Sequence, residues 1–283
     1  MPRPGPETQI GGPDAHPGPR YGAWLWTLRD HLNRTDTADG TLLHAADLVA
    51  DYLLATSDLP CYDCWEECPQ RRHTSTLACV IAGLAAVAEP LNRSDLARHA
   101  DRLRKQLDSC HVRSGTYVKH DASDSVDASL LWLTLPFGVV AADEPRMTAT
   151  VTRIADELTG PSGGIRRYCG DTFYGGGEWI HLTAWLGWYH ASTGDLDAAD
   201  AFRRWVEAAA TPDGHLPEQI TTGPQYPEYL PPWQGRWGPV ATPLLWSHAM
   251  YLVLDHAIAA AWPPVATQPA GADTTAGTGL NRP

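Results

Sequence analysis

Apolar residues recur at three- and four-residue spacing over most of the chain, which is the pattern of amphipathic helices. In the segment 41–55, for example, Leu42, Ala45, Val49 and Leu53 fall on one helical face. Strand signals are nearly absent, because no Asn-Gly or Asp-Gly turn separates two alternating runs. The pattern and its start and stop signals predict nine helices, over about 21–32, 41–55, 75–88, 94–107, 126–139, 145–159, 178–191, 196–209 and 242–261.

The linkers between these helices alternate between two kinds. Some are short, such as 192–194, whereas 57–73, 111–124, 160–177 and 211–241 are long and rich in Gly, aromatic and charged residues. Short loops on one side and long, residue-rich loops on the other are typical of stacked α-hairpins closed into a ring. The sequence therefore predicts an all-α helical toroid.

The two ends of the chain differ from its middle. Residues 1–19 and 263–283 are rich in Pro and Gly and have no periodicity, so we expect both to be disordered. Residues 20–262 then form one barrel domain.

Composition and charge narrow the classes of partner. The chain has 283 residues, 43% of them hydrophobic, and a net charge of −12, which argues against nucleic acid and anionic membranes as partners. The longest apolar run, Cys79–Ala88, is far shorter than the roughly 20 residues that span a bilayer, and the first residues have no secretory signal pattern. We therefore expect a soluble, cytoplasmic protein.

Three of the long loops carry candidate chemistry. In the first, Trp65 precedes Glu66 and Glu67, and an indole beside paired carboxylates can desolvate one acid and raise its pKa. An ordinary acidic pair on the surface is the alternative. In the third loop, within 211–241, a single glutamate, Glu218, lies between Pro217 and Gln219.

The second loop combines glycines with polar and aromatic side chains. Arg167, Tyr168, Asp171 and Glu178 can hydrogen-bond to hydroxyl groups, and Trp179 can stack on a sugar ring. An ordinary surface loop is again the alternative, and no phosphate-binding pattern follows the glycines.

The cysteines allow a metal site as one interpretation. Cys61, Cys64, Cys68 and His73 lie within thirteen residues, and structural zinc sites use such ligands. The usual second pair of ligands is missing, so free thiols are favoured. We expect no metal and no cofactor.

Four separate motifs, taken in order, carry a family resemblance. YDCWEE, RYCGDTFYGGGEW, LPEQ and LLWSHA resemble glycoside hydrolase family 15, the glucoamylase family, in its bacterial branch. That branch is similar to enzymes that act on maltose, isomaltose-type oligosaccharides, dextran ends or trehalose. The resemblance spans about residues 20–261 and implies an (α/α)6 barrel whose active site is built by the loops that precede the even-numbered helices.

The resemblance also implies a role for each matching residue. The first glutamate of the first motif, Glu66, takes the place of the general acid, and Glu67 that of a ligand for substrate hydroxyls. Glu218 takes the place of the general base. Arg167 and Asp171 match sugar-binding positions of the R-Y-x-x-D motif, which includes Tyr168, and Trp179 matches an aromatic wall.

The chemistry of glycoside hydrolysis agrees with this pairing of carboxyl groups. An inverting enzyme holds a protonated acid and an ionised base roughly 6.5–9.5 Å apart across the sugar. We expect Trp65 and Glu67 to raise the pKa of Glu66, and a wetter, hydrogen-bonded site to keep Glu218 charged. Glu66, Glu218, Arg167 and Asp171 should then face one pocket, with Trp179 at its edge and an α-glucan oligosaccharide or disaccharide as the ligand.

The chain also departs from the family pattern. A complete barrel of the family has twelve helices, so we expect the first three to be missing, together with the W-x-R-D motif that grips the sugar. Leu28-Arg29-Asp30 falls within a predicted helix and does not replace that motif. We expect an incomplete barrel that exposes Leu25, Leu53 and the helix end at Trp262, with another chain or the Pro-rich N-terminus covering the open edge.

The sequence is compatible with three functions. The first is an inverting exo-acting α-glucosidase that releases β-glucose. The second is a catalytically impaired pseudoenzyme or carbohydrate-binding fragment, and the third is a trehalase-like hydrolase.

Overall fold

The computed structural model describes residues 18–35 and 39–261. Nine α-helices lie in this part of the chain: α1 (Gly18–Arg34), α2 (Gly40–Thr56), α3 (Thr74–Val87), α4 (Ser94–Cys110), α5 (Pro145–Leu158), α6 (Ile180–Ser192), α7 (Leu196–Ala208), α8 (Leu230–Trp237) and α9 (Leu245–Ala261). The prediction for 263–283 lies outside the described residues. So does that for 1–19, except that Gly18 and Pro19 already belong to α1.

The described chain is helical, as predicted, and its strands have two residues each. Three short 3-10 helices complete the elements: η1 (Ala128–Leu133), η2 (Phe173–Gly175) and η3 (Pro227–Tyr229). β1 (Val112–Arg113) pairs with β2 (Thr116–Tyr117), and β3 (Glu178–Trp179) pairs with β4 (Gln219–Ile220), both antiparallel. The second pair joins the loop ahead of α6 to the loop ahead of α9.

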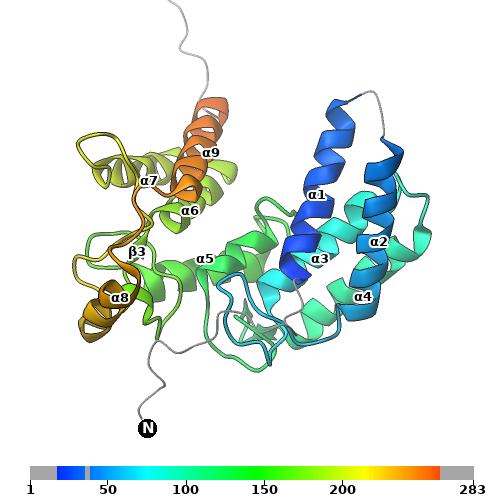
Figure 1. The fold of residues 1–283 in the computed structure, drawn as a ribbon, viewed down its shortest axis with the longest axis horizontal. Coiled ribbons are helices and arrows are strands. Elements are labelled where there is room, and N and C mark those ends of the chain that lie inside the picture. The colour runs from blue at the N-terminus through cyan, green and yellow to red at the C-terminus, as the bar shows by residue number, and fades with distance from the viewer. Residues whose placement is uncertain (1–17, 36–38, 262–283) are drawn as a thin grey trace, which may run out of the picture.

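The helices form an open arc (Figure 1). Along its inner side α1, α3, η1, α6 and α9 contact one another in that order, and α2, α4, α5 and α7 pack behind them. In Figure 1 the ribbons of α1 and α9 stand apart at the open side of the arc. The long loops precede α3, η1, α6 and α9, the inner elements that follow α1 along the arc.

Glycines bring the first two inner helices into close contact. A Cβ atom on Gly83 of α3 would lie 2.3 Å from the carbonyl oxygen of Gly22 in α1, and one on Gly22 would lie 2.4 Å from the carbonyl oxygen of Cys79. Only glycine allows the two backbones to approach so closely. α3 itself is buried along most of its length and forms the centre of this half of the arc.

Two predicted helices differ from the observed ones. The segment 126–139 forms only η1, because Pro136 disfavours helical backbone in the residue before it. α8 falls within 211–241, which we interpreted as a loop rich in Gly, aromatic and charged residues. Pro231 and Pro232 open this helix, since a proline in the first turn loses no helical hydrogen bond.

The prediction of which apolar residues lack cover was wrong. Leu25 and Leu53 are fully buried, because α1 packs against α3, and α2 packs against α3 and α4. Trp262 lies outside the described residues. Leu245 and Leu252 of α9 are the most exposed apolar side chains of the described residues, at 84% and 64%. Exposed apolar side chains also occur elsewhere, at Tyr21, Trp24, Leu48, Leu59 and Trp237.

Among the helices of the described ranges, none combines the length and the apolar character that crossing a membrane requires.

Candidate active site

A tight turn ahead of α3 sets the direction of the two adjacent glutamates. The Oδ1 atom of Asp63 accepts hydrogen bonds from the backbone N–H groups of Trp65 (2.9 Å) and Glu67 (2.8 Å). Glu66, between them, has a φ of 61°, which is uncommon for a residue other than glycine. Because of this turn, Glu66 and Glu67 meet different surroundings.

Glu66 lines a cavity of about 340 Å³ on the inner side of the arc. Trp26 of α1, Trp132 and Phe137 around η1, and Trp185 of α6 form much of the apolar wall of this cavity. The Glu66 side chain is 53% exposed and forms an ion pair with Arg20 of α1. The predicted desolvation of Glu66 by Trp65 is therefore absent, because the turn directs this carboxylate to the open cavity.

Glu67 points to the loop ahead of α6. Its carboxylate accepts a hydrogen bond from Arg167 Nη2 (3.2 Å) and another from the Tyr168 hydroxyl. Arg167 also donates from Nε to Asp171 (2.7 Å), and both Arg167 and Asp171 are buried. Four of the predicted sugar-binding residues thus form one hydrogen-bonded cluster, although about 100 residues separate Glu67 from the other three.

Aromatic rings enclose this cluster. The guanidinium carbon of Arg167 lies 5.1–5.4 Å from four ring centroids, which belong to Trp65, Tyr168, Phe173 and Trp179. Cations are attracted to ring faces at this distance. The rings and the ion pair with Asp171 together hold the guanidinium in one orientation.

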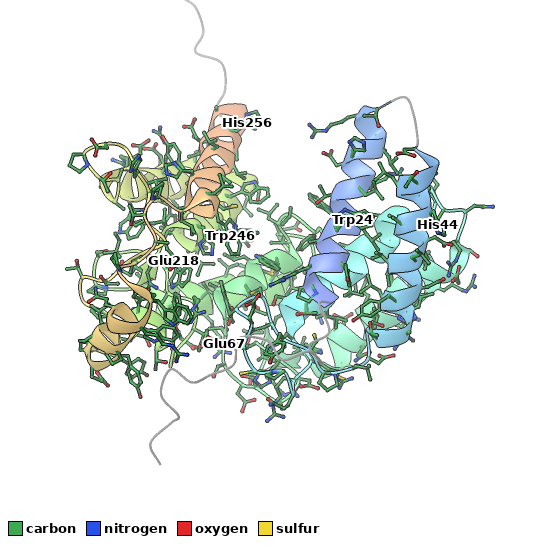
Figure 2. The ribbon with its side chains drawn as sticks, viewed as in Figure 1. Trp24, His44, Glu67, Glu218, Trp246 and His256 are labelled. Carbon is green, nitrogen blue, oxygen red and sulfur yellow. The ribbon has the colours of Figure 1, made fainter. Side chains whose placement is uncertain are left out.

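Glu218 lies in the loop ahead of α9, fixed by backbone hydrogen bonds to Ala241 and Ile180. Burial raises the pKa of its carboxyl group to about 7, and the nearby Arg167 opposes that rise only in part. The expectation of a wet site that keeps Glu218 charged is therefore wrong. Glu218 does not line the cavity that Glu66 lines. Figure 2 labels Glu67 and Glu218, which come from loops on different parts of the arc.

The structure separates the roles of Glu178 and Trp179. Glu178 is buried and accepts hydrogen bonds from the backbone N–H groups of Ser162 (3.0 Å) and Gly164 (2.7 Å). Its carboxylate is directed into the 160–164 turn rather than to a sugar. Trp179 is also buried, and it lies beside Trp65 with ring centroids 5.9 Å apart.

Several buried polar atoms beside this cluster have no hydrogen-bond partner. They include the indole Nε1 of Trp179, the Nε2 of Gln219 and both ring nitrogens of His181. His181 stacks on Trp246, with ring centroids 4.1 Å apart, and burial lowers its pKa to about 3. Buried polar atoms are rarely left unpaired, so such a group indicates a place for a polar ligand.

Sequence reasoning gave no role to Asp63, Lys119, Asp127 or His181. Asp63 belongs to the quoted YDCWEE motif and Lys119 to the rich loop 111–124, so those two segments contained the signal. His181 and Asp127 follow no pattern of spacing. His248, the histidine of the LLWSHA motif, accepts a hydrogen bond from the backbone N–H of Leu216 (3.0 Å) and so supports the Glu218 loop.

No group of three or more His, Cys, Asp or Glu side chains is placed to hold a metal ion in the described ranges 18–35 and 39–261. All six cysteines are free thiols.

Comparison with known proteins relates these features to a family. The model of glycosyl hydrolases family 15 matches residues 23–194, more than half of the chain. The isomaltose glucohydrolase of Kribbella flavida is 41% identical over 241 residues, which cover 83% of this chain and 62% of that enzyme. The chain therefore spans less than two thirds of this relative.

Solved structures agree with that assignment. A wild-type glycosidase is 39% identical with a TM-score of 0.82, covering 88% of this chain and 68% of its own. A bacterial glucoamylase complexed with acarbose is 21% identical with a TM-score of 0.63, covering 85% of this chain and 39% of its own. The likeness confirms the predicted glucoamylase-type (α/α) toroid, part of which this chain covers. The chain belongs to glycosyl hydrolases family 15.

Proposed function

We propose that this protein is an inverting, exo-acting hydrolase that releases β-glucose from α-linked gluco-oligosaccharides or disaccharides. In this proposal Glu66 is the general acid and Glu218 the general base. Glu67, Arg167 and Asp171 bind the glucose unit, and Trp65, Tyr168 and Trp179 are its further contacts. Glu178, the remaining residue of the expected set, instead supports the 160–164 turn that precedes this cluster. The name of the Kribbella flavida relative, an isomaltose glucohydrolase, supports a substrate of this class.

The observation that carries the proposal is the cluster of Glu67, Arg167, Tyr168 and Asp171 enclosed by aromatic rings. A sugar offers hydroxyl groups, which need both donors and acceptors, and an apolar ring face, which needs an aromatic partner. The unpaired Nε1 of Trp179 and ring nitrogens of His181 lie in the same enclosure and provide further donors or acceptors. A carbohydrate would satisfy these groups together.

The two catalytic carboxyl groups act at opposite faces of the sugar. Glu66, on the cavity wall, protonates the leaving oxygen, and the released sugar departs through the cavity. Glu218 takes a proton from the attacking water and must be ionised to do so. Because its pKa is about 7, turnover should rise as the pH increases through that value.

The ion pair between Arg20 and Glu66 favours a second candidate, a carbohydrate-binding protein without turnover. An arginine stabilises the ionised carboxylate and so opposes the protonated form that a general acid requires. This candidate shares the sugar site and differs only at the chemical step.

Glucose release distinguishes the two functions. The full chain is incubated with isomaltose, maltose and trehalose, and the anomer first released is identified by proton NMR. We expect β-glucose, and Glu66→Gln and Glu218→Gln should each abolish its release while glucose binding, measured by calorimetry, persists. Release of α-glucose would contradict inversion, and binding without release by the wild type would favour the second candidate.

A further inference from the structure

Lys119 is a buried cation that the proposed reaction leaves without a role. It is one of only two lysines in the chain, and its side chain is 10% exposed. It follows β2 in the 111–124 loop. This loop is rich in Gly, aromatic and charged residues, and none of the roles proposed above falls on it. A charged group is costly to bury unless it is paired, so its partners indicate why it is there.

Two of these partners are aspartates. The Nζ atom lies 3.1 Å from Asp127 Oδ2 and 3.6 Å from Asp63 Oδ2. Asp63 holds the turn that orients Glu66 and Glu67, through the backbone N–H groups described above. Asp127 accepts from the indole Nε1 of Trp65 at 3.1 Å and caps η1 through the N–H of Ser129. Both carboxylates therefore fix the Trp65 segment.

The third partner lies on the sugar-binding loop. The Lys119 ammonium sits 3.2 Å from the ring centroid of Tyr168, whose hydroxyl donates to Glu67. One ammonium group thus contacts residues of three loops: the loop ahead of α3, the start of η1 and the loop ahead of α6.

We propose that Lys119 is a positioning residue that holds the Trp65–Glu67 turn against Tyr168 and so sets the geometry of both carboxylates in that turn. The inference rests on the proposed hydrolase function. It adds a residue that does not touch the substrate and acts through Asp63 and Asp127.

Electrostatics gives the proposal a pH signature. Burial raises the pKa of Asp63 and the neighbouring Asp127 raises it further, whereas Lys119 lowers it. Without the ammonium, Asp63 should take up a proton nearer neutral pH and become a weaker acceptor for the two turn N–H groups. The titratable and charged groups that surround Lys119 and Asp63 are Cys64, Glu67, Cys68, His73, His120, Asp127, Arg167 and Tyr168.

The test compares Lys119→Met with Lys105→Met, in which the other lysine, exposed on α4, is changed in the same way. We expect Lys119→Met to lower kcat/KM for isomaltose at least tenfold at pH 6 and to recover much of it by pH 8.5. Lys105→Met should follow the wild-type profile. The double variant Lys119→Met/Asp63→Asn, in which residue 63 cannot titrate, should return to the wild-type pH dependence at a lower rate.

A purely structural role of Lys119 predicts a change in rate that does not depend on pH. If Lys119→Met lowers the rate by the same factor at every pH, or changes nothing, the positioning role is wrong. If Lys119→Met does not fold, as judged by circular dichroism, Lys119→Arg keeps the charge and should keep the wild-type pH dependence. A shifted profile in the arginine variant would also overturn the proposal.

A measurement without turnover separates this inference from the proposed function. In tryptophan-labelled protein, the Trp65 indole N–H signal is identified by its loss in Trp65→Phe. We expect this signal to move with pH between 6 and 8.5 in Lys119→Met but not in the wild type. If the wild type releases no glucose and the signal still behaves in this way, only the hydrolase proposal fails. A signal that does not move in Lys119→Met overturns the role of Lys119.

Discussion

The burial of Glu218 predicts a pH-dependent loss of stability that a single substitution should remove. Its pKa rises from an ordinary 4.5 to about 7 because the folded chain takes the carboxyl group out of water. The folded state therefore binds this proton more tightly than the unfolded state does. Stability that is present below pH 4.5 should be lost as the pH rises through 7.

The magnitude follows from the pKa values. Each pKa unit corresponds to about 1.4 kcal/mol, so ionised Glu218 should cost the folded protein about 3 kcal/mol relative to the protonated form. Glu218→Gln keeps the size and polarity of the side chain and removes its titration. The variant should match the wild type in free energy of unfolding at pH 4 and exceed it by about 3 kcal/mol at pH 8.

Urea unfolding, followed by tryptophan fluorescence at several pH values, measures this difference directly. Glu228→Gln is a matched control, because Glu228 of η3 is exposed and its carboxylate meets water in both states. We expect no pH-dependent difference between that control and the wild type. A difference between Glu218→Gln and the wild type that stays constant from pH 4 to pH 8 would refute the reasoning.

Two further predictions concern packing. Gly83→Ala should lower the free energy of unfolding by about 1–3 kcal/mol, because the new methyl group would lie 2.3 Å from the carbonyl oxygen of Gly22. Gly40→Ala is the control, since its methyl group would meet no atom within 4 Å, and chemical unfolding of both variants checks the difference. The exposed Leu245 and Leu252 should make the chain self-associate, and replacing both by Lys should shift the light-scattering mass towards the monomer; a wild type that is monomeric at all concentrations would contradict this.

Periodicity was a good guide to the fold wherever a helix has one buried face. α2, α4, α5 and α7 are of this kind, and their observed bounds lie within a few residues of those predicted. It failed at η1, where five of the six side chains are apolar and no polar face can be identified. It also failed at α8, where prolines that open a helix cannot be told from prolines that end one.

The candidate site could be predicted only in part. The motifs identified Glu67, Arg167, Tyr168 and Asp171, which the structure brings into one cluster. The surroundings of each carboxyl group depend on contacts between distant parts of the chain, which the spacing of residues along the sequence does not reveal. Glu66 differs from its neighbour because the turn gives it a positive φ, a property of the backbone rather than of the residue type.

The excess of negative charge at the site should have opposite effects on the stability of the folded chain and on the proposed reaction. Negative groups outnumber positive ones around the enclosure: Asp63, Glu67, Asp127, Asp171 and Glu218 face Lys119 and Arg167. An excess of negative charge destabilises the folded chain, since buried like charges repel one another. The same excess would stabilise the positive charge that develops on the sugar ring as a glycosidic bond breaks. The stability that Glu218→Gln is expected to restore would thus be the counterpart of catalysis, and a variant that gains stability at pH 8 should lose turnover at the same pH.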